Sequence, residues 1–164
     1  MRVKISMIDQ DLRAVGRMMK LLNFTFTESG MRLLHRLQRA GKPRVRDRQM
    51  QNTEEWITRR DGSQMRICVF RPLSAIGQVP GVLWLHGGGY ALGTPEQSRR
   101  YARALMAASD CVVVAPDYRL SCEAPYPAAL DDSYQALLWM KSHAVELGIS
   151  ENQLMVGGDS AGGG

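Results

Sequence analysis

The sequence has few cysteines and histidines and no long apolar run. Its three cysteines form no Cys-x-x-Cys pair, and its three histidines show no metal-ligand spacing with cysteine or acidic residues, so no metal site is expected. No stretch approaches the length of a membrane span, and the charged N-terminus is not typical of a signal peptide. Because Cys68 and Cys111 stand in apolar stretches, we expect buried free thiols and a cytoplasmic location.

Sites for phosphate groups are also missing. The sequence has no Gly-Lys-Ser or Gly-Lys-Thr loop. A dinucleotide fingerprint that began at Gly87 would require glycine or alanine where Leu92 stands. No cofactor is therefore expected.

Positive charge is concentrated in the first third of the chain. Residues 1–60 contain 14 lysines and arginines and 6 acidic residues, whereas residues 61–164 contain 7 and 10. Such a bias is compatible with an anionic partner, either nucleic acid or a membrane surface. Because no nucleic-acid motif or interleaved aromatic residues accompany the charge, we favour a solvated helical face and expect no nucleic-acid partner.

The N-terminal part has helical periodicity. Apolar residues recur every three or four positions over residues 8–22, which predicts a helix with one apolar stripe. A second helix is predicted over residues 27–41, with an inward face formed by Met31, Leu34 and Leu37. With 164 residues, 45% of them hydrophobic, the chain can form one domain with a packed core.

After a polar, basic stretch at residues 44–53, which is predicted to be a linker, the pattern predicts a sheet. Strands at residues 55–58 and 65–71 are predicted to pair across Asp61-Gly62, a dipeptide that accepts the positive φ angles of a tight hairpin. Three nearly continuous apolar strands follow, at residues 81–85, 111–115 and 153–156. Such strands are typical of a parallel sheet buried on both faces. Helices are predicted between them, at residues 95–108 and 131–147.

Two of these strands end in glycine-rich turns, at the edge where open α/β sheets place their active sites. Residues 158–162 read Gly-Asp-Ser-Ala-Gly, the nucleophile-elbow pattern of serine hydrolases. A strand that turns directly into a helix presses together the residues two before and two after the serine, so Gly158 and Gly162 supply the missing side chains. Ser160 is expected to be the nucleophile, in a strained conformation. Asp159 is interpreted as a structural neighbour, because adjacent residues at an elbow point apart.

The other turn is His86-Gly87-Gly88-Gly89-Tyr90, which follows the strand at residues 81–85. Ester hydrolysis passes through a tetrahedral intermediate with a negatively charged oxygen, which must be met by hydrogen-bond donors already in place. We expect this oxyanion hole to be formed by the backbone N–H groups of Gly87, Gly88 and Ala161.

Four motifs, in this order, resemble the hormone-sensitive-lipase-like esterases of the α/β-hydrolase superfamily. They are residues 86–89, 117–120 (Asp-Tyr-Arg-Leu), 125–132 (Pro-Tyr-Pro-Ala-Ala-Leu-Asp-Asp) and 158–163. The resemblance implies an α/β fold with a mostly parallel sheet and flanking helices, in which residues 54–164 form the N-terminal part of the core. The sequence departs from the family at residues 121–124, Ser-Cys-Glu-Ala, where the family more often has Ala-Pro-Glu-His.

The same resemblance assigns roles to further residues. It implies that His86 and Gly89 shape the oxyanion loop, and that residues 1–45 form a helical cap segment over the active site; simple packing of these helices on the main domain is an equal alternative. In this family an Asp or Glu and then a His follow the serine. Both are expected to be missing from this sequence, in which the C-terminal half of the fold is incomplete.

Other polar residues are given structural roles. His35 and His143 are expected to lie at the surface or at a helix end. Asp117 and Arg119 are expected to form a pair that fixes a loop.

The sequence therefore predicts a carboxylic ester hydrolase that acts on small molecules, with little turnover from this sequence alone. Two alternatives stay open. One is a non-catalytic ligand-binding relative, because hydrolase folds can lose their base and keep their pocket. The other is a truncated, non-functional product, because the strand at residues 153–156 would be an uncovered edge.

Overall fold

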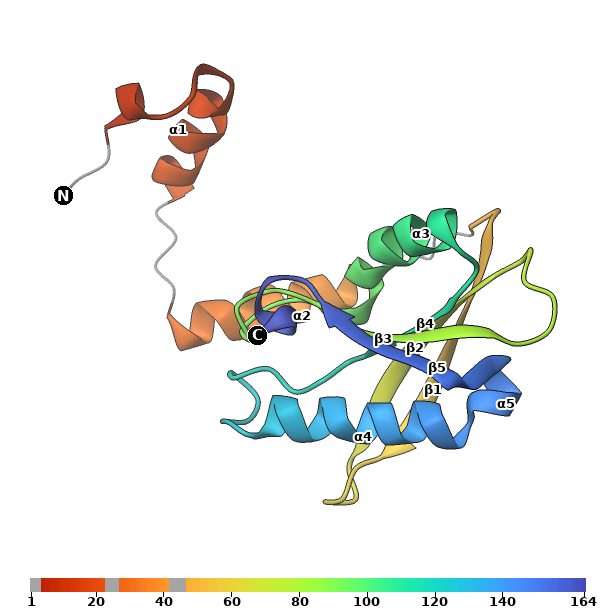
Figure 1. The fold of residues 1–164 in the computed structure, drawn as a ribbon. Coiled ribbons are helices and arrows are strands. Elements are labelled where there is room, and N and C mark those ends of the chain that lie inside the picture. The colour runs from red at the N-terminus through yellow and green to blue at the C-terminus, as the bar shows by residue number, and fades with distance from the viewer. Residues whose placement is uncertain (1–3, 23–26, 42–46) are drawn as a thin grey trace.

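The centre of the molecule is a five-stranded sheet with the order β1-β2-β4-β3-β5 (Figure 1). The computed structural model describes residues 4–22, 27–41 and 47–164. β1 pairs antiparallel with β2 and β2 with β4, whereas β3 runs parallel to both β4 and β5. The strands are β1 (Met50–Thr58), β2 (Gln64–Pro72), β3 (Val79–Leu85), β4 (Val112–Pro116) and β5 (Ile149–Gly158).

The predicted helices are all present within the described ranges. The predicted helix at residues 95–108 consists of a 3₁₀ turn followed by α3, and the one at residues 131–147 is divided into α4 and α5. The α-helices are α1 (Arg13–Leu22), α2 (Glu28–Ala40), α3 (Arg99–Ala108), α4 (Ala128–Ser142) and α5 (Ala144–Leu147), and the 3₁₀ turns are η1 (Ile5–Met7), η2 (Gln10–Leu12), η3 (Pro95–Ser98) and η4 (Ser160–Gly163). No helix within these ranges is both long and apolar enough to cross a membrane.

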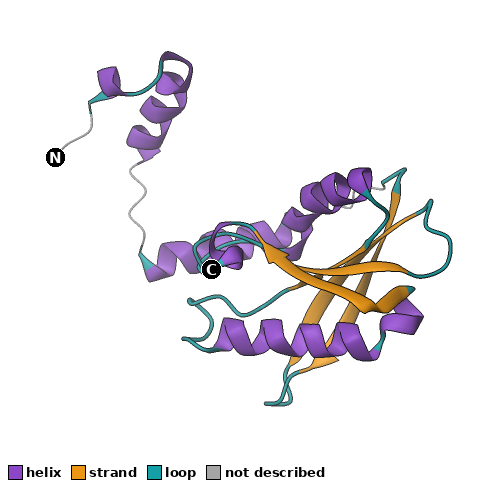
Figure 2. Ribbon diagram, in the orientation of Figure 1, coloured by secondary structure: helices purple, strands orange, loops and turns teal. Residues whose placement is uncertain are grey.

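Helices cover both faces of the sheet, with α3 on one side and α4 on the other (Figure 2). Alternate side chains of β2 pack into the hydrophobic cores on the two faces of the sheet. Met65, Ile67 and Val69 pack on the α4 side, whereas Cys68 and Phe70 pack on the α3 side. Both faces of this hairpin strand are therefore buried. The free thiols of Cys68 and Cys111 are buried, as predicted.

The two edges of the sheet differ from the sequence-based expectation. β1 begins at Met50, so residues 50–53 belong to a strand and not to the predicted linker; residues 44–46 lie outside the described residues. At the other edge, β5 has the apolar run typical of a strand buried on both faces, yet Met155 and Val156 are 52% and 57% exposed. This exposure is what the truncated-product alternative expects of an uncovered edge. The difference at β1 concerns an edge strand, which need not follow the apolar pattern of central ones.

Helix α2 begins as predicted, because the Thr27 hydroxyl accepts a hydrogen bond from the Gly30 N–H (3.2 Å). Its inward face keeps only part of the predicted apolar stripe: Met31 and Leu34 are half-buried, but Leu37 is 60% exposed and His35 is only 4% exposed. α2 therefore docks through a mixed polar and apolar face, and its last turn lies beside the loop after β3, where Gln38 accepts the Gly93 N–H.

Candidate active site

Ser160 lies at the apex of the turn between β5 and η4. Its φ angle is +52°, in the left-handed region that non-glycine residues rarely adopt. The residue is exposed, and its hydroxyl has no hydrogen-bond partner among the described residues. The sequence-based expectation of a strained, outward-facing serine is met by this geometry.

The glycines around Ser160 are required by close backbone contacts. A Cβ atom on Gly158 would lie 2.1 Å from the Gly162 carbonyl oxygen, and one on Gly162 would lie 2.1 Å from the Leu85 carbonyl oxygen. No real Cβ makes such contacts, so any side chain here would push β5, the turn and the end of β3 apart.

Gly158→Ala is therefore expected to destabilise the fold by about 3 kcal/mol or more, because the clash is with backbone that cannot rotate away. Gly163→Ala is the matched control, since its Cβ would meet only the Gly158 carbonyl oxygen, at 3.3 Å. Urea unfolding of both variants measures the difference. Equal stability of the two variants would contradict this account of the elbow.

The glycine loop after β3 packs directly against this turn. A Cβ on Gly87 would lie 3.2 Å from the Ser160 Cβ and 2.6 Å from an Asp159 carboxylate oxygen. Gly88 has a φ angle of +137°, and its carbonyl oxygen accepts the N–H groups of Ala91 (3.2 Å) and Leu92 (3.0 Å). The described residues offer no acceptor to the N–H groups of Gly87 and Gly88.

His86 is buried beneath this loop and does not reach Ser160 with a hydrogen bond. Its Nδ1 lies 3.0 Å from the Gly87 carbonyl oxygen, and its ring stacks on Tyr118 with 4.4 Å between centroids. The Tyr118 hydroxyl donates to the His86 carbonyl oxygen. Tyr118 belongs to one of the motifs behind the family resemblance. The sequence analysis did not predict that its buried hydroxyl supports the glycine loop. An aromatic residue with a polar tip directly after a buried strand is the signal that could have indicated it.

His35 was predicted to lie at the surface, but the structure buries it on α2. Burial lowers its pKa, an effect opposed by Glu123 and Asp117 and reinforced by Arg39. Burial also lowers the pKa of His86; the Gly87 carbonyl, Asp117 and Asp159 oppose this, and His35 reinforces it.

His143, at the end of α4, stacks on Trp139 and lies at a helix end as predicted.

Stability is expected to fall as the pH drops from about 7.5 to 5.5. Both buried histidines have a folded-state pKa below the usual 6.5, so below 6.5 the unfolded chain binds more protons than the folded one. Each histidine can then cost up to about 1.4 kcal/mol per pH unit. Urea midpoints across this range measure the slope, which His35→Gln should reduce. A flat or inverted slope would contradict the prediction.

Asp159, next to the candidate nucleophile, is held from the α3 side of the sheet. Its carboxylate accepts a hydrogen bond from the Trp84 indole (3.2 Å) and lies 3.8 Å from the Arg100 guanidinium. Trp84 stacks on Tyr101 of α3, with 4.6 Å between ring centroids. These contacts support the interpretation of Asp159 as a structural neighbour, because they engage both of its carboxylate oxygens.

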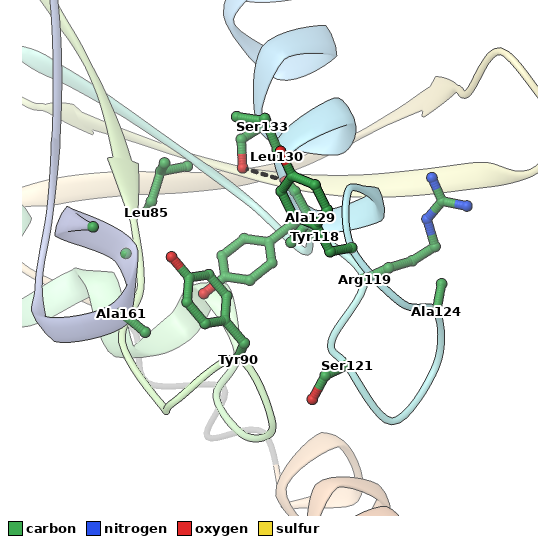
Figure 3. A pocket seen from close by; sticks show the side chains of 13 residues that line it. Leu85, Tyr90, Tyr118, Arg119, Ser121, Ala124, Ala129, Leu130, Ser133 and Ala161 are labelled. Atoms are coloured by element: carbon green, nitrogen blue, oxygen red, sulfur yellow. Dashed lines mark hydrogen bonds between the residues drawn. The ribbon is translucent and has the colours of Figure 1, made fainter.

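A pocket of about 510 Å³ opens beside Ala161 and Gly162 (Figure 3). Its lining is mostly apolar, and Figure 3 shows the side chains of Tyr90 and Tyr118 projecting into it, while the Arg119 guanidinium points away. Its other lining residues include Leu85, Ala124, Tyr126, Ala129 and Leu130. Such a pocket suits an apolar group of a small molecule.

Two ion-pair clusters fix the loop between β4 and α4, and they differ from the predicted Asp117–Arg119 pair. Asp117 pairs instead with Arg66 (3.2 Å) and Arg39 (3.1 Å). Arg119 pairs with Asp132 (2.8 Å) and Asp61 (3.0 Å). Asp117 and Arg119 thus form their ion pairs with residues that are distant in sequence. Their closeness within one motif did not indicate these partners.

One group of potential metal ligands exists in the described part of the chain. Atoms of Glu54, Cys68 and Glu96 lie within 4.8 Å of one another. The Arg66 guanidinium already occupies this cluster, at 2.9 Å from Glu54 and 2.6 Å from Glu96. A fixed cation among the carboxylates leaves them a poor metal site.

Known proteins share this arrangement of strands and turns. The sequence profile of the α/β-hydrolase fold family matches residues 82–164, just over half of the chain. The chain belongs to the α/β-hydrolase fold family. Among its relatives, a carboxylesterase of Mycobacterium tuberculosis, NlhH, is 40% identical over 111 residues, covering 67% of this chain and 35% of the relative. An AB hydrolase superfamily protein of Schizosaccharomyces pombe is 44% identical over 97 residues, 58% of this chain and 28% of the relative.

Solved structures of α/β hydrolases agree with these relatives. A bacterial heroin esterase superposes with a TM-score of 0.76 at 28% identity, covering 98% of this chain and 51% of its own. The metagenomic carboxylesterase EstE1 gives a TM-score of 0.66 at 35% identity, covering 82% and 44%. The predicted resemblance to hormone-sensitive-lipase-like esterases is confirmed. The chain spans about a third of the length of the curated relatives it matches and about half that of the solved structures.

Proposed function

We propose that this α/β hydrolase is a carboxylic ester hydrolase in which Ser160 is the nucleophile. The observation that carries the proposal is the positive φ angle of Ser160 on an exposed turn that packs against the glycine loop. A strained backbone conformation is kept only where its surroundings enforce it, and such residues cluster at active sites. The carboxylesterases and esterases among its relatives favour the same chemistry.

The oxyanion would be held by the N–H groups of Gly87, Gly88 and Ala161. Those of Gly87 and Gly88 have no acceptor within the described residues, and a hole of this kind needs such donors at the start of the reaction. His86 and Gly89 would shape the loop, and Gly158, Asp159 and Gly162 would hold the elbow. Residues 1–45 would form a cap segment beside the core.

Ser160 would attack the ester carbonyl, and a histidine base oriented by an acid would take its proton. None of the histidines among the described residues bonds to Ser160. We therefore place the base and the acid outside residues 1–164 and expect these residues alone to give at most about 10³- to 10⁴-fold over the reaction in water. The apolar pocket would receive one side of a small carboxylic ester.

A ligand-binding protein without catalysis is the second candidate, because the pocket is formed while the described residues supply no base. The natural gene product should be assayed with short-chain nitrophenyl esters and treated with a fluorophosphonate, followed by mass spectrometry of the modified peptide. Turnover together with a phosphonyl group on Ser160 would support the esterase. Saturable ligand binding with neither result would favour the binding protein, and modification of a different residue would contradict Ser160 as nucleophile.

A further inference from the structure

The last turn of α2 is joined to the glycine loop by a polar contact. The Gln38 side-chain oxygen accepts a hydrogen bond from the Gly93 N–H at 3.2 Å. Gly93 closes the loop that begins at His86, and its φ angle is +110°. A Cβ at this position would lie 2.4 Å from the His86 Nδ1 and 2.6 Å from the Gly87 carbonyl oxygen. Gly93 therefore lies directly against the peptide that follows Gly87, and a shift of one moves the other.

The neighbouring Arg39 joins the same helix turn to a second loop, between β4 and α4. Its guanidinium lies 3.1 Å from Asp117 and 3.4 Å from Glu123. Glu123 in turn accepts the Leu120 N–H at 3.0 Å. This second loop also contacts the glycine loop directly, because the Ser121 N–H donates a hydrogen bond to the Tyr90 carbonyl oxygen at 2.6 Å.

One face of α2 makes these polar contacts. His35, Gln38 and Arg39 are spaced three and four residues apart, which places them on one helix face. His35 is 4% exposed, whereas the apolar Leu33 and Leu37 are each 60% exposed. Apolar packing tolerates sliding, but hydrogen bonds to defined backbone atoms fix both position and orientation.

We propose that Gln38 is a positioning residue for the oxyanion loop, with Arg39 holding the adjacent loop in register. This inference rests on the proposed esterase function. Gln38 touches no reacting atom; it holds Gly93, and Gly93 sets the place of the Gly87 peptide. A displacement of about 1 Å in such a group can lower a rate by about 10²-fold, although the substrate still binds.

The test compares three variants of the natural gene product. Gln38→Met removes the acceptor at similar length, whereas Gln38→Glu keeps an acceptor oxygen. Gln135→Met is the matched control, because Gln135 likewise accepts a backbone N–H, that of Arg60 at 3.0 Å, but on α4. We expect Gln38→Met to lower kcat for a nitrophenyl ester by about tenfold or more with KM within about twofold. Gln38→Glu should restore most of kcat, and Gln135→Met should change neither constant.

Amide hydrogen exchange supplies a readout that does not depend on turnover. The Gly93 amide should exchange faster in Gln38→Met than in the wild type and in Gln38→Glu. The inference is overturned if Gln38→Met keeps its kcat, if Gln38→Glu is as slow as Gln38→Met, or if Gly93 exchange is unchanged. If the wild type hydrolyses no ester, the proposed function fails on its own, and the Gly93 exchange rates still decide whether Gln38 holds the loop.

Discussion

Replacing Ser160 with alanine is expected to lower kcat for nitrophenyl ester hydrolysis by the natural gene product by roughly 10⁴- to 10⁶-fold. The hydroxyl is the only nucleophile placed at the turn beside the glycine loop in the described residues. The variant should unfold at nearly the wild-type urea concentration, since alanine fits the space of the serine. Ser142→Ala, at the far end of α4, should keep full activity.

Ser160→Gly separates chemistry from backbone strain. It should be as inactive as Ser160→Ala but more stable by about 1 kcal/mol, because glycine adopts a φ angle of +52° without a steric penalty. Activity of either variant above about 1% of the wild type, in a preparation free of other hydrolases, would remove Ser160 from the proposed mechanism.

Asp132→Asn is expected to destabilise the domain by about 3–5 kcal/mol. Asp132 is fully buried, and its carboxylate lies 3.0 Å from the Arg59 Nε, 2.8 Å from the Arg119 Nη2 and 2.8 Å from the Arg119 backbone N–H. The asparagine amide keeps the shape of the carboxylate but removes the negative charge that the two arginines share. Its N–H₂ group would also face the N–H donors of these arginines. Arg59, which is 9% exposed, cannot turn out to water to compensate.

The matched control for this prediction is Asp131→Asn, one residue earlier and exposed. It removes the same charge from the first turn of α4 and should cost less than about 1 kcal/mol. Urea unfolding measured by far-UV circular dichroism gives both values. A loss below about 1 kcal/mol for Asp132→Asn would show that the buried cluster contributes little to stability.

The elbow and the glycine loop could be predicted from sequence because their physics is local. Only glycine fits where Gly158 and Gly162 meet backbone oxygens, so the requirement is visible in four or five neighbouring residues. The central strands β3 and β4 were equally clear, since burial on both faces leaves continuous apolar runs. The relatives then confirmed the fold and the family.

The polar contacts could not be predicted, because their partners are far apart in sequence. His35 looks like an ordinary surface residue of a helix until the glycine loop and the residues around Asp117 and Glu123 surround it. In the sequence, Asp117 and Arg119 resemble an ion pair. In the fold, Asp117 forms its ion pairs with Arg66 and Arg39. The order of charges along the chain therefore does not indicate which residues form ion pairs in the fold.

The anchoring of Asp159 separates two properties of the molecule. Trp84 and Arg100 hold this neighbour of Ser160 from the α3 side, whereas the pocket is lined by the start of α4. Substitutions at Leu130 can therefore change which ligands fit without loosening that anchor. The α4 residues that shape the pocket and the residues that anchor Asp159 can thus vary separately, on opposite faces of one sheet.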